Sequence, residues 1–410
     1  MSIVFEFEEE NSMPKAGELA VNPEVLKWAR TTAGLSIPQV VQILELTTDF
    51  ILDIESRQRK LSKTLLSRLA KLYKRPLTVL FLPEPPDEKN IPTDYRILPD
   101  RKQIIGPETA YALREARRLQ EVLSDLAEDP KSVSPFNQLL VKVKDEPAYV
   151  GVHIRKILGV DLTEQKRWFN APQAFREWRG KLQGAGVYVL VEDFPREEAR
   201  GFSLWHPDLI PMIIVSRNEA PAAQIFTLLH ELAHVLLRSD AICLKKEDET
   251  LLGTIEAWCN RVAAASLVPE DDLARVLEKR GKASVQEWLL DDLYELASLY
   301  KVSRHVIAIR LEETGHAPKG YYNRVKESLN PDDYSIIKAR VRKAGEPKEY
   351  RRDIPRQRLA EVGFAATTTI LEACRNSTLS TMEVADLLRV RPSKFSRLFD
   401  LAANQSQRYG

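Results

Sequence analysis

The sequence is poor in cysteine, has no long apolar run and has no overall excess of one charge. Three cysteines among 410 residues are too few for a disulfide scaffold and suit a reducing cytoplasm. No run of about 18 apolar residues occurs, which argues against a membrane-spanning helix. The first ten residues lack the basic and apolar regions of a secretory signal. We therefore expect a cytoplasmic protein that works without a membrane.

The charge is balanced over the whole chain but not along it. There are 60 Lys and Arg against 59 Asp and Glu, which argues against a protein that is basic throughout. Residues 1–21 carry a net charge of −4, whereas residues 22–75 carry +5 and residues 319–358 carry +6. A basic segment can face nucleic-acid phosphates, or it can simply form a solvated helical surface.

Proline content and residue patterns divide the chain into several domains. Prolines crowd residues 76–99, which predicts an extended linker. Residues 186–191, 201–205 and 210–215 have strand patterns, and helical patterns dominate from residue 222 onward. The predicted fold class is α+β and mostly α. We predict an acidic extension (1–20), a helix-turn-helix bundle (21–82), a Pro-rich linker (83–99), an α+β domain (100–325) and a helical C-terminal domain (326–410).

The most specific motif is His230-Glu231-Leu232-Ala233-His234, in a segment rich in helix formers and apolar residues. In a helix, positions i and i+4 share one face, so both imidazoles can reach one metal ion. Glu231 is placed to take a proton from water that attacks a carbonyl. This is the arrangement of zinc hydrolases. The alternative is a pair of histidines satisfied without a metal, which is costly in so apolar a helix.

The next helical segment, 254–269, offers a third ligand. Glu256 lies 22 residues after His234, and Asn260 shares its helix face and can orient it. Thr254 is a candidate cap for this helix, and the small residues 263–265 allow close packing on the His-Glu-x-x-His helix. Without that motif, Glu256 would be a surface carboxylate and Asn260 a cap or core amide. Cys259, Cys243 and Cys374 are predicted to be small core residues.

Residues 35–47 and 48–55 predict a helix, a turn and a second helix, with Ser36 as the first N-cap. Candidate DNA contacts are Thr47, Thr48, Arg57, Arg59, Lys60 and Lys63. Asp49 and Asp53 on the second helix would repel phosphates, and Glu45 occupies a turn that often holds glycine. The segment is therefore predicted to contact either DNA or another protein. Residues 362–401 show a similar pattern with a second cluster of bases, for which packing is the favoured interpretation.

Together these motifs resemble the ImmA/IrrE family of metallopeptidases with a fused XRE/Cro-type helix-turn-helix. The resemblance to the helix-turn-helix module runs from residues 29–36 through residues 69–76, and a connector follows at 80–86 and 94–96. Residues 200–203, 226–234 and 256–260 match the peptidase core, and residues 296–311 and 320–323 match its tail. Val41 stands where the module usually has alanine, and Glu45 and Arg57 stand where it usually has glycine.

The resemblance implies a zincin-like core that holds one Zn²⁺ per chain, with His230, His234 and Glu256 as ligands and Glu231 as the base. It also implies an endopeptidase that cleaves a regulatory protein, with an XRE-type repressor as the expected substrate in a stress response. The helix-turn-helix module would recruit the enzyme to DNA or to its substrate. The alternative is a DNA-binding transcription regulator, or an antitoxin-like sensor, whose metal site is vestigial or sensory. The sequence leaves open whether the chain forms a homodimer.

Overall fold

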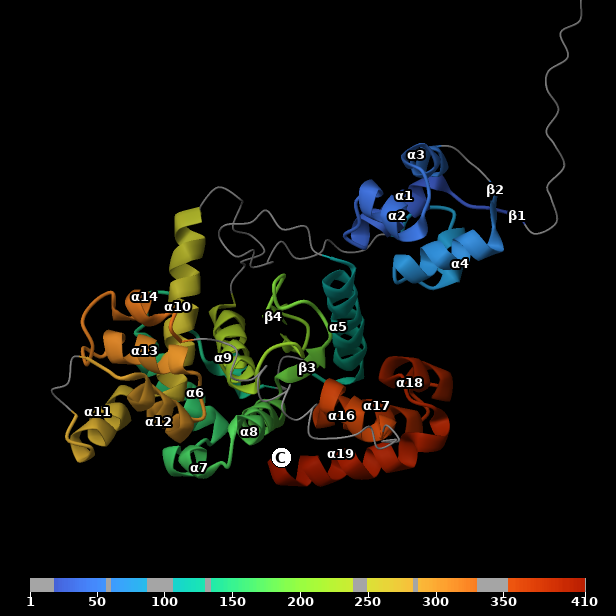
Figure 1. Cartoon of the computed structure of the whole chain (residues 1–410). Helices are drawn as coiled ribbons and strands as arrows, with labels where there is room; N and C mark the ends of the chain where they lie inside the picture. Colours follow the sequence, from blue (N-terminus) through green and yellow to red (C-terminus); the bar gives the residue numbers. More distant parts are fainter. Residues whose placement is uncertain are drawn as a thin grey trace, which may run out of the picture. The chain divides into compact units, whose positions relative to one another are not determined.

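The computed structural model describes residues 18–56, 60–86, 106–129, 134–238, 249–282, 287–329 and 353–409. The chain forms two compact units, one of residues 1–91 with 100–113 and the other of residues 92–99 with 114–410. Helices dominate the described residues and the sheets are small (Figure 1). The fold class is therefore α+β and mostly α, as the sequence predicted.

The first unit is a helical bundle around one apolar core. Fully buried Leu26, Leu66 and Leu69 belong to this core and come from the first and last of its α-helices. A short antiparallel pair of strands links the segment before the first helix to the segment between the third and fourth helices. The elements are β1 (Glu18–Ala20), α1 (Pro23–Thr32), α2 (Ile37–Leu44), α3 (Thr48–Ser56), β2 (Lys60–Ser62), α4 (Lys63–Leu72) and the 3-10 helix η1 (Leu77–Phe81).

Helices α2 and α3 cover the segments predicted as two helices joined by a turn. Ser36 is the N-cap of α2, and its backbone N–H donates to Oε1 of Gln39 at 2.8 Å. The chain leaves α2 through Glu45, whose φ of 55° is left-handed. Glycine adopts this conformation without a steric penalty, whereas another residue costs about 1 kcal/mol. This geometry explains why glycine is common at the position that Glu45 occupies.

The second unit contains a three-stranded sheet of order β3-β5-β4, formed by β3 (Tyr188–Glu192), β4 (Gly201–Leu204) and β5 (Met212–Ser216). β3 runs parallel to β5, and β4 runs antiparallel to it. The first strand begins two residues later than predicted because Gly186 has a φ of 74°, outside the β region. The pairing of β3 with β5 begins at Tyr188 and Met212, so Ile210 and Pro211 of the predicted strand 210–215 lie outside β5.

Helix α9 lies at the centre of the second unit, where α8, α10 and the strands β4 and β5 pack against it. Gly151 of α6 allows α6 to approach α10 closely, since a Cβ there would lie 2.9 Å from the backbone N of Ser266. Helix α5 (Pro107–Leu126) belongs to this unit from Arg114 onward. The other helices of this part are α6 (Pro147–Leu158), α7 (Leu162–Arg167), α8 (Ala171–Gly184), α9 (Pro221–Leu237), α10 (Glu249–Leu267), α11 (Glu270–Lys279), α12 (Leu290–Tyr300), α13 (Arg304–Glu313) and α14 (Tyr321–Val325), with a 3-10 helix η2 (Pro135–Gln138).

The C-terminal helices pack on the same unit. They are α16 (Ile354–Val362), α17 (Phe364–Arg375), α18 (Thr381–Leu388), the 3-10 helix η4 (Pro392–Lys394) and α19 (Phe395–Tyr409). α16 packs on β3, and α19 packs on α8. Arg179 of α8 donates to the carbonyl oxygens of Val189 at 2.7 Å and Glu361 at 2.9 Å. These contacts agree with packing as the role of this region, while the predicted domain boundaries stay predictions.

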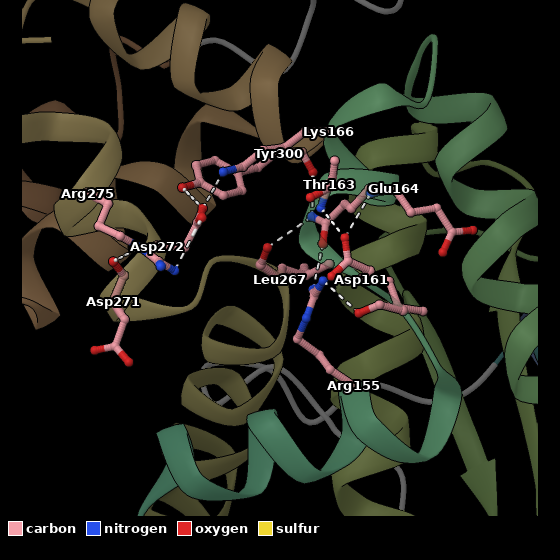
Figure 2. Close-up of polar contacts among 12 residues, drawn as sticks. Arg155, Asp161, Thr163, Glu164, Lys166, Leu267, Asp271, Asp272, Arg275 and Tyr300 are labelled. Carbon is pink, nitrogen blue, oxygen red and sulfur yellow. Dashed lines mark hydrogen bonds and ion pairs between the residues drawn. The ribbon is translucent and has the colours of Figure 1, made fainter. Parts of the chain in front are cut away.

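A buried polar network fixes the C-terminal end of α10. Arg155 of α6 donates to Oε1 of Gln165 at 2.6 Å and to the carbonyl oxygen of Ser266 at 2.9 Å. Gln165 in turn donates to the carbonyl oxygens of Leu267 at 3.0 Å and Tyr300 at 2.8 Å. Figure 2 shows Arg155, Leu267 and Tyr300 among the residues of this network. The donors satisfy carbonyls that the end of a helix leaves without intrahelical partners.

Several predicted segments lie outside the described residues. They are residues 1–17 of the acidic extension, residues 87–99 of the linker and residues 330–352 of the second basic segment. In the described part of the chain, no helix combines the length and the apolar character needed to cross a membrane.

Candidate metal centre

Helix α9 carries the His-Glu-x-x-His motif in its C-terminal half and is buried along most of its length. Pro221 lies in its first turn, where the missing N–H costs nothing. His230, Glu231 and His234 are 7%, 3% and 5% exposed. Ionisable groups buried to this degree are costly unless they have polar or metal partners. The position of the motif therefore calls for a partner close to α9.

The carboxylate of Glu256 in α10 lies beside both imidazoles. His230 Nε2 is 3.6 Å from Glu256 Oε2, and His234 Nε2 is 3.6 Å from Glu256 Oε1. The three ligand atoms all lie within 4.8 Å of one another. A tetrahedral zinc ion with ligands at about 2.0–2.2 Å separates those ligands by about 3.4 Å. The spacing of the two nitrogens and the carboxylate therefore fits a zinc ion.

The environment of His234 also fits a metal. Its Nε2 atom is buried and has no hydrogen-bond partner in the structure. A buried polar atom without a partner costs about 1–3 kcal/mol. The ring of Phe226, one helical turn before His230, stacks on the His230 imidazole with ring centroids 6.0 Å apart. The chain thus places the imidazoles by packing and leaves a nitrogen available as a ligand.

Helix α10, which carries Glu256, begins further upstream than predicted. It begins at Glu249, so Thr254 lies inside the helix and the prediction that Thr254 caps it is wrong. Residues 249–253 continue the helical pattern upstream, and a single glycine among them does not interrupt it. The predicted small residues at positions 263–265 are buried, and α10 packs on both α6 and α9.

The other candidate residues singled out from the sequence, Asn260 and the cysteines, differ in how deeply they are buried. Asn260 is exposed on α10, so its predicted role in orienting Glu256 stays a prediction. Cys259 is fully buried, as expected for a small core residue, whereas Cys374 is half-buried and Cys243 lies outside the described residues. Among the described residues, His230, His234 and Glu256 are the group of His, Cys, Asp or Glu side chains that can hold a metal.

Gly201 is a residue near the site whose role sequence reasoning missed. A Cβ on Gly201 would lie 2.5 Å from Thr227 Cγ2, 2.8 Å from the carbonyl oxygen of Ile214 and 3.5 Å from Glu231 Cγ. The absence of a side chain therefore lets β4 lie directly against α9 at Glu231. A glycine at the first residue of a predicted strand was the available signal, because such glycines mark close backbone approach.

The predicted DNA contacts belong to the first unit. Thr47, Thr48, Lys60 and Lys63 are exposed, so their side chains are available to a partner. Arg57 and Arg59 lie outside the described residues. In the second unit, two bases of the C-terminal cluster already have partners. Arg389 donates to Glu115 at 2.7 Å and Arg397 donates to Asp353 at 2.5 Å.

Comparison with known proteins agrees with this geometry. Residues 182–312, which include α9, α10 and the sheet, match the family model described as Peptidase_M78, the IrrE N-terminal-like domain. The chain is also 34% identical over 115 residues to the radiation response metalloprotease IrrE of Deinococcus radiodurans. That match covers 27% of this chain and 33% of the relative, so the chain spans about a third of the relative it matches.

Proposed function

Because residues 182–312 match the Peptidase_M78 model and part of the chain is similar to the metalloprotease IrrE, we propose that the chain is a zinc-dependent endopeptidase of the ImmA/IrrE type. His230, His234 and Glu256 are the proposed zinc ligands, and Glu231 is the proposed general base. The observation that carries the proposal is the convergence of two buried imidazoles and one carboxylate, with ligand atoms within 4.8 Å of one another. Three protein ligands with one open position are typical of a catalytic zinc site.

The proposed chemistry is hydrolysis of a peptide bond. Zinc in this site would supply Lewis acidity, which makes water nucleophilic near neutral pH and polarises a carbonyl. Glu231 accepts the proton of the attacking water at its carboxylate and then delivers it to the amide nitrogen that leaves. A C–O bond forms, the C–N bond breaks, and Glu231 returns to its ionised form. Glu231 follows His230 in α9 and is 3% exposed, so its carboxylate is largely shielded from bulk water.

The sheet supports an extended peptide as substrate. Within the described residues, β4 is hydrogen-bonded to β5 and lies at one end of the strand order. The exposed edge of a strand can pair with an added peptide strand. Gly201 brings β4 against Glu231, so a peptide paired with β4 would pass close to the proposed base. We propose that the substrate presents an extended segment of a regulatory protein, with an XRE-type repressor as the candidate that the family resemblance suggests.

The decisive experiment separates metal binding from catalysis. Zinc content should be measured by elemental mass spectrometry for the wild type and for His230→Ala, Glu256→Ala and Glu231→Gln. We expect about one zinc per chain in the wild type and in Glu231→Gln, and a clear loss in the two ligand variants. Glu231→Gln should lower hydrolysis of a disordered protein substrate by at least about a hundredfold.

Other outcomes would reject the proposal. Unchanged zinc content in both ligand variants would show that these residues do not hold the metal. Full zinc content with no hydrolysis by the wild type, together with duplex DNA binding that survives Glu231→Gln, would favour the DNA-binding regulator with a sensory metal site. The variant Asn260→Ala should be measured in the same experiment. If Asn260 orients Glu256, this variant should bind zinc more weakly but should still bind it.

A further inference from the structure

The first unit exposes apolar side chains on α2 and α3. Ile43 of α2 is 54% exposed and Leu52 of α3 is 48% exposed, although both helices belong to a well-packed bundle. Glu45, between the two helices, and Asp49, in the first turn of α3, are also exposed. We call these four exposed side chains, on α2, on the turn and on α3, the α2–α3 face; Asp49 and Leu52 are three residues apart on one side of α3.

The four side chains of the α2–α3 face include two acids and no base, although Arg68 of α4 reaches the end of α2 and donates to the carbonyl oxygen of Leu44 at 3.0 Å. Residues 31–56 contain no lysine and no arginine. Glu45 and Asp49 make no ion pair with a described residue. Glu55, also in α3, points inward and is neutralised by Arg30, whose Nε and Nη2 donate to its carboxylate at 2.6 and 2.7 Å.

This combination argues against duplex DNA as the occupant. Affinity for DNA comes mainly from lysines and arginines that neutralise phosphates. A helix that enters the major groove must pass between two phosphate backbones, which Glu45 and Asp49 would repel. Exposed Ile43 and Leu52 would gain little from phosphates, whereas exposed apolar residues beside charge are typical of protein interfaces.

We propose that the α2–α3 face binds a positively charged protein surface that carries apolar side chains. Lysines or arginines of the partner would pair with Glu45 and Asp49, and its apolar side chains would cover Ile43 and Leu52. The DNA-contacting helix of a DNA-binding protein has this basic character. The inference rests on the proposed function in one respect, since the bound protein would be the substrate that the peptidase domain cleaves.

The same unit offers matched controls on α4. Lys63 and Lys71 are exposed on that helix, and neither lies on the α2–α3 face. If the unit bound DNA through its bases, substitution of these two lysines would weaken binding. If the α2–α3 face binds a basic protein, the same substitutions would leave protein binding unchanged or improve it slightly.

The test measures binding of a labelled amphipathic helical peptide of alternating leucine and lysine clusters to the full chain, by fluorescence anisotropy. A peptide of lysines alone and a duplex DNA of 30 base pairs serve as the other probes. All chains carry Glu231→Gln so that the peptide is not cleaved. Binding is then independent of catalysis, and the zinc measurement above separately reports a failure of the proposed function.

We expect the leucine–lysine peptide to bind, and Ile43→Ala with Leu52→Ala to weaken its binding by about tenfold. Glu45→Lys with Asp49→Lys should weaken it by about tenfold or more and make it less sensitive to salt. Lys63→Glu with Lys71→Glu should leave it within about twofold. Circular dichroism of each variant should match the wild type, because all six positions are exposed.

Three results would overturn the inference. One is equal binding of the leucine–lysine and lysine-only peptides, which would show charge attraction without a shaped surface. Another is peptide binding that is unaffected by changes at Ile43 and Leu52. The third is binding of the duplex DNA that Lys63→Glu with Lys71→Glu abolishes and Glu45→Lys with Asp49→Lys does not impair, which would assign the unit to nucleic acid.

Discussion

Helices α3 and α9 both bury ionisable side chains, but they satisfy them in different ways. In α3, the carboxylate of Glu55 is held by two charge-assisted hydrogen bonds from Arg30 of the same bundle. In α9, Nε2 of His234 is buried without a hydrogen bond and lies 3.6 Å from the carboxylate of Glu256. A buried charge that the fold neutralises itself contributes to structure. A buried ligand atom that the fold leaves without a hydrogen bond indicates a partner from outside the chain.

The two helices also differ in how completely their apolar side chains are covered. α9 is covered by neighbouring helices and strands along most of its length, so its apolar residues serve the core. α3 leaves Leu52 exposed beside acidic residues, although its inner side is well buried. Departures from the expected distribution of polar and apolar groups thus identify a polar site in α9 and an apolar surface on α3.

The largest expected effect tests whether Glu55 is structural. Glu55→Gln leaves the buried guanidinium of Arg30 without its counter-ion, and we expect a loss of about 3–5 kcal/mol in the stability of the first unit. Hydrogen exchange of residues 22–81, measured by mass spectrometry on the full chain, should report the change locally. Asp49→Asn, on the exposed side of the same helix, should change stability by less than about 1 kcal/mol. Equal effects would remove the contrast between the two sides of α3.

A matched pair of leucines tests the contrast in burial. Leu232 of α9 is fully buried, and Leu232→Ala should lower the stability of the second unit by about 2–5 kcal/mol. Leu52 of α3 is half exposed, and Leu52→Ala should change the stability of the first unit by less than about 0.5 kcal/mol. Urea unfolding of the full chain, followed by hydrogen exchange in each unit, measures both. A large loss for Leu52→Ala would show that Leu52 supports the bundle.

The third prediction concerns Asp272 of α11, which has partners within the fold as Glu55 does. Tyr300 donates to its Oδ2 at 2.6 Å, and Lys166 Nζ lies 2.5 Å from the same atom (Figure 2). Burial alone would raise the pKa of Asp272, but the hydrogen bonds from Lys166 and Tyr300, together with the positive charges of Lys166 and Arg275, lower it below its ordinary value. Because this pKa is lower in the folded state, the stabilisation is present above the ordinary value of 3.8 and is lost as the pH falls through the folded value.

Asp272→Asn should therefore cost about 2 kcal/mol at pH 7, and this difference from the wild type should shrink below pH 3.8. Urea denaturation of both proteins between pH 3 and pH 7 measures the difference. Asp271→Asn, at the exposed neighbouring position, is the control and should have little effect at any pH. A cost that stays constant with pH would show that the side chain acts through packing.

The parts of the site that lie within one helix could be predicted from the sequence, whereas contacts between helices could not. The spacing of His230 and His234 fixes their positions on one helix face, so these two residues could be placed together from the sequence. The contact of Glu256 with both imidazoles depends on the packing of α10 on α9. The sequence offered Glu256 only as a candidate in the next helical segment, and the family resemblance implied that it is a ligand. Thr254 was taken for a cap because a threonine at the start of an apolar pattern is a common N-cap, yet the helix extends further upstream.

A glycine at the start of a predicted strand signals a close backbone approach, but the sequence does not show which element approaches Gly201, because that depends on tertiary packing. Gly201 is not in a left-handed conformation, so its value lies in the space that it leaves for Thr227 and Glu231. The exposure of Ile43 and Leu52 likewise appears only once the bundle is packed, since their helices have the apolar pattern of buried helices. In both cases tertiary contacts decide the outcome, and local patterns do not contain that information.

The smallest expected effect on stability, and the one most specific to the site, comes from Gly201→Ala. The added Cβ would lie 2.5 Å from Thr227 Cγ2 and 2.8 Å from the carbonyl oxygen of Ile214, so β4 or α9 must shift. We expect a loss of about 1–2 kcal/mol in stability and about a tenfold loss in kcat, with zinc content unchanged. Thr227→Ser in the same chain removes the methyl group and should restore part of both losses.

Gly253→Ala is the matched control for this substitution. A Cβ at Gly253, within α10, would meet no atom within 4 Å, so alanine should stabilise the helix slightly and leave kcat unchanged. Equal behaviour of Gly201→Ala and Gly253→Ala would mean that the close approach of β4 to Glu231 has no role in catalysis. A loss confined to Gly201→Ala and relieved by Thr227→Ser would instead show that α9 needs β4 at this distance for its buried polar groups to act.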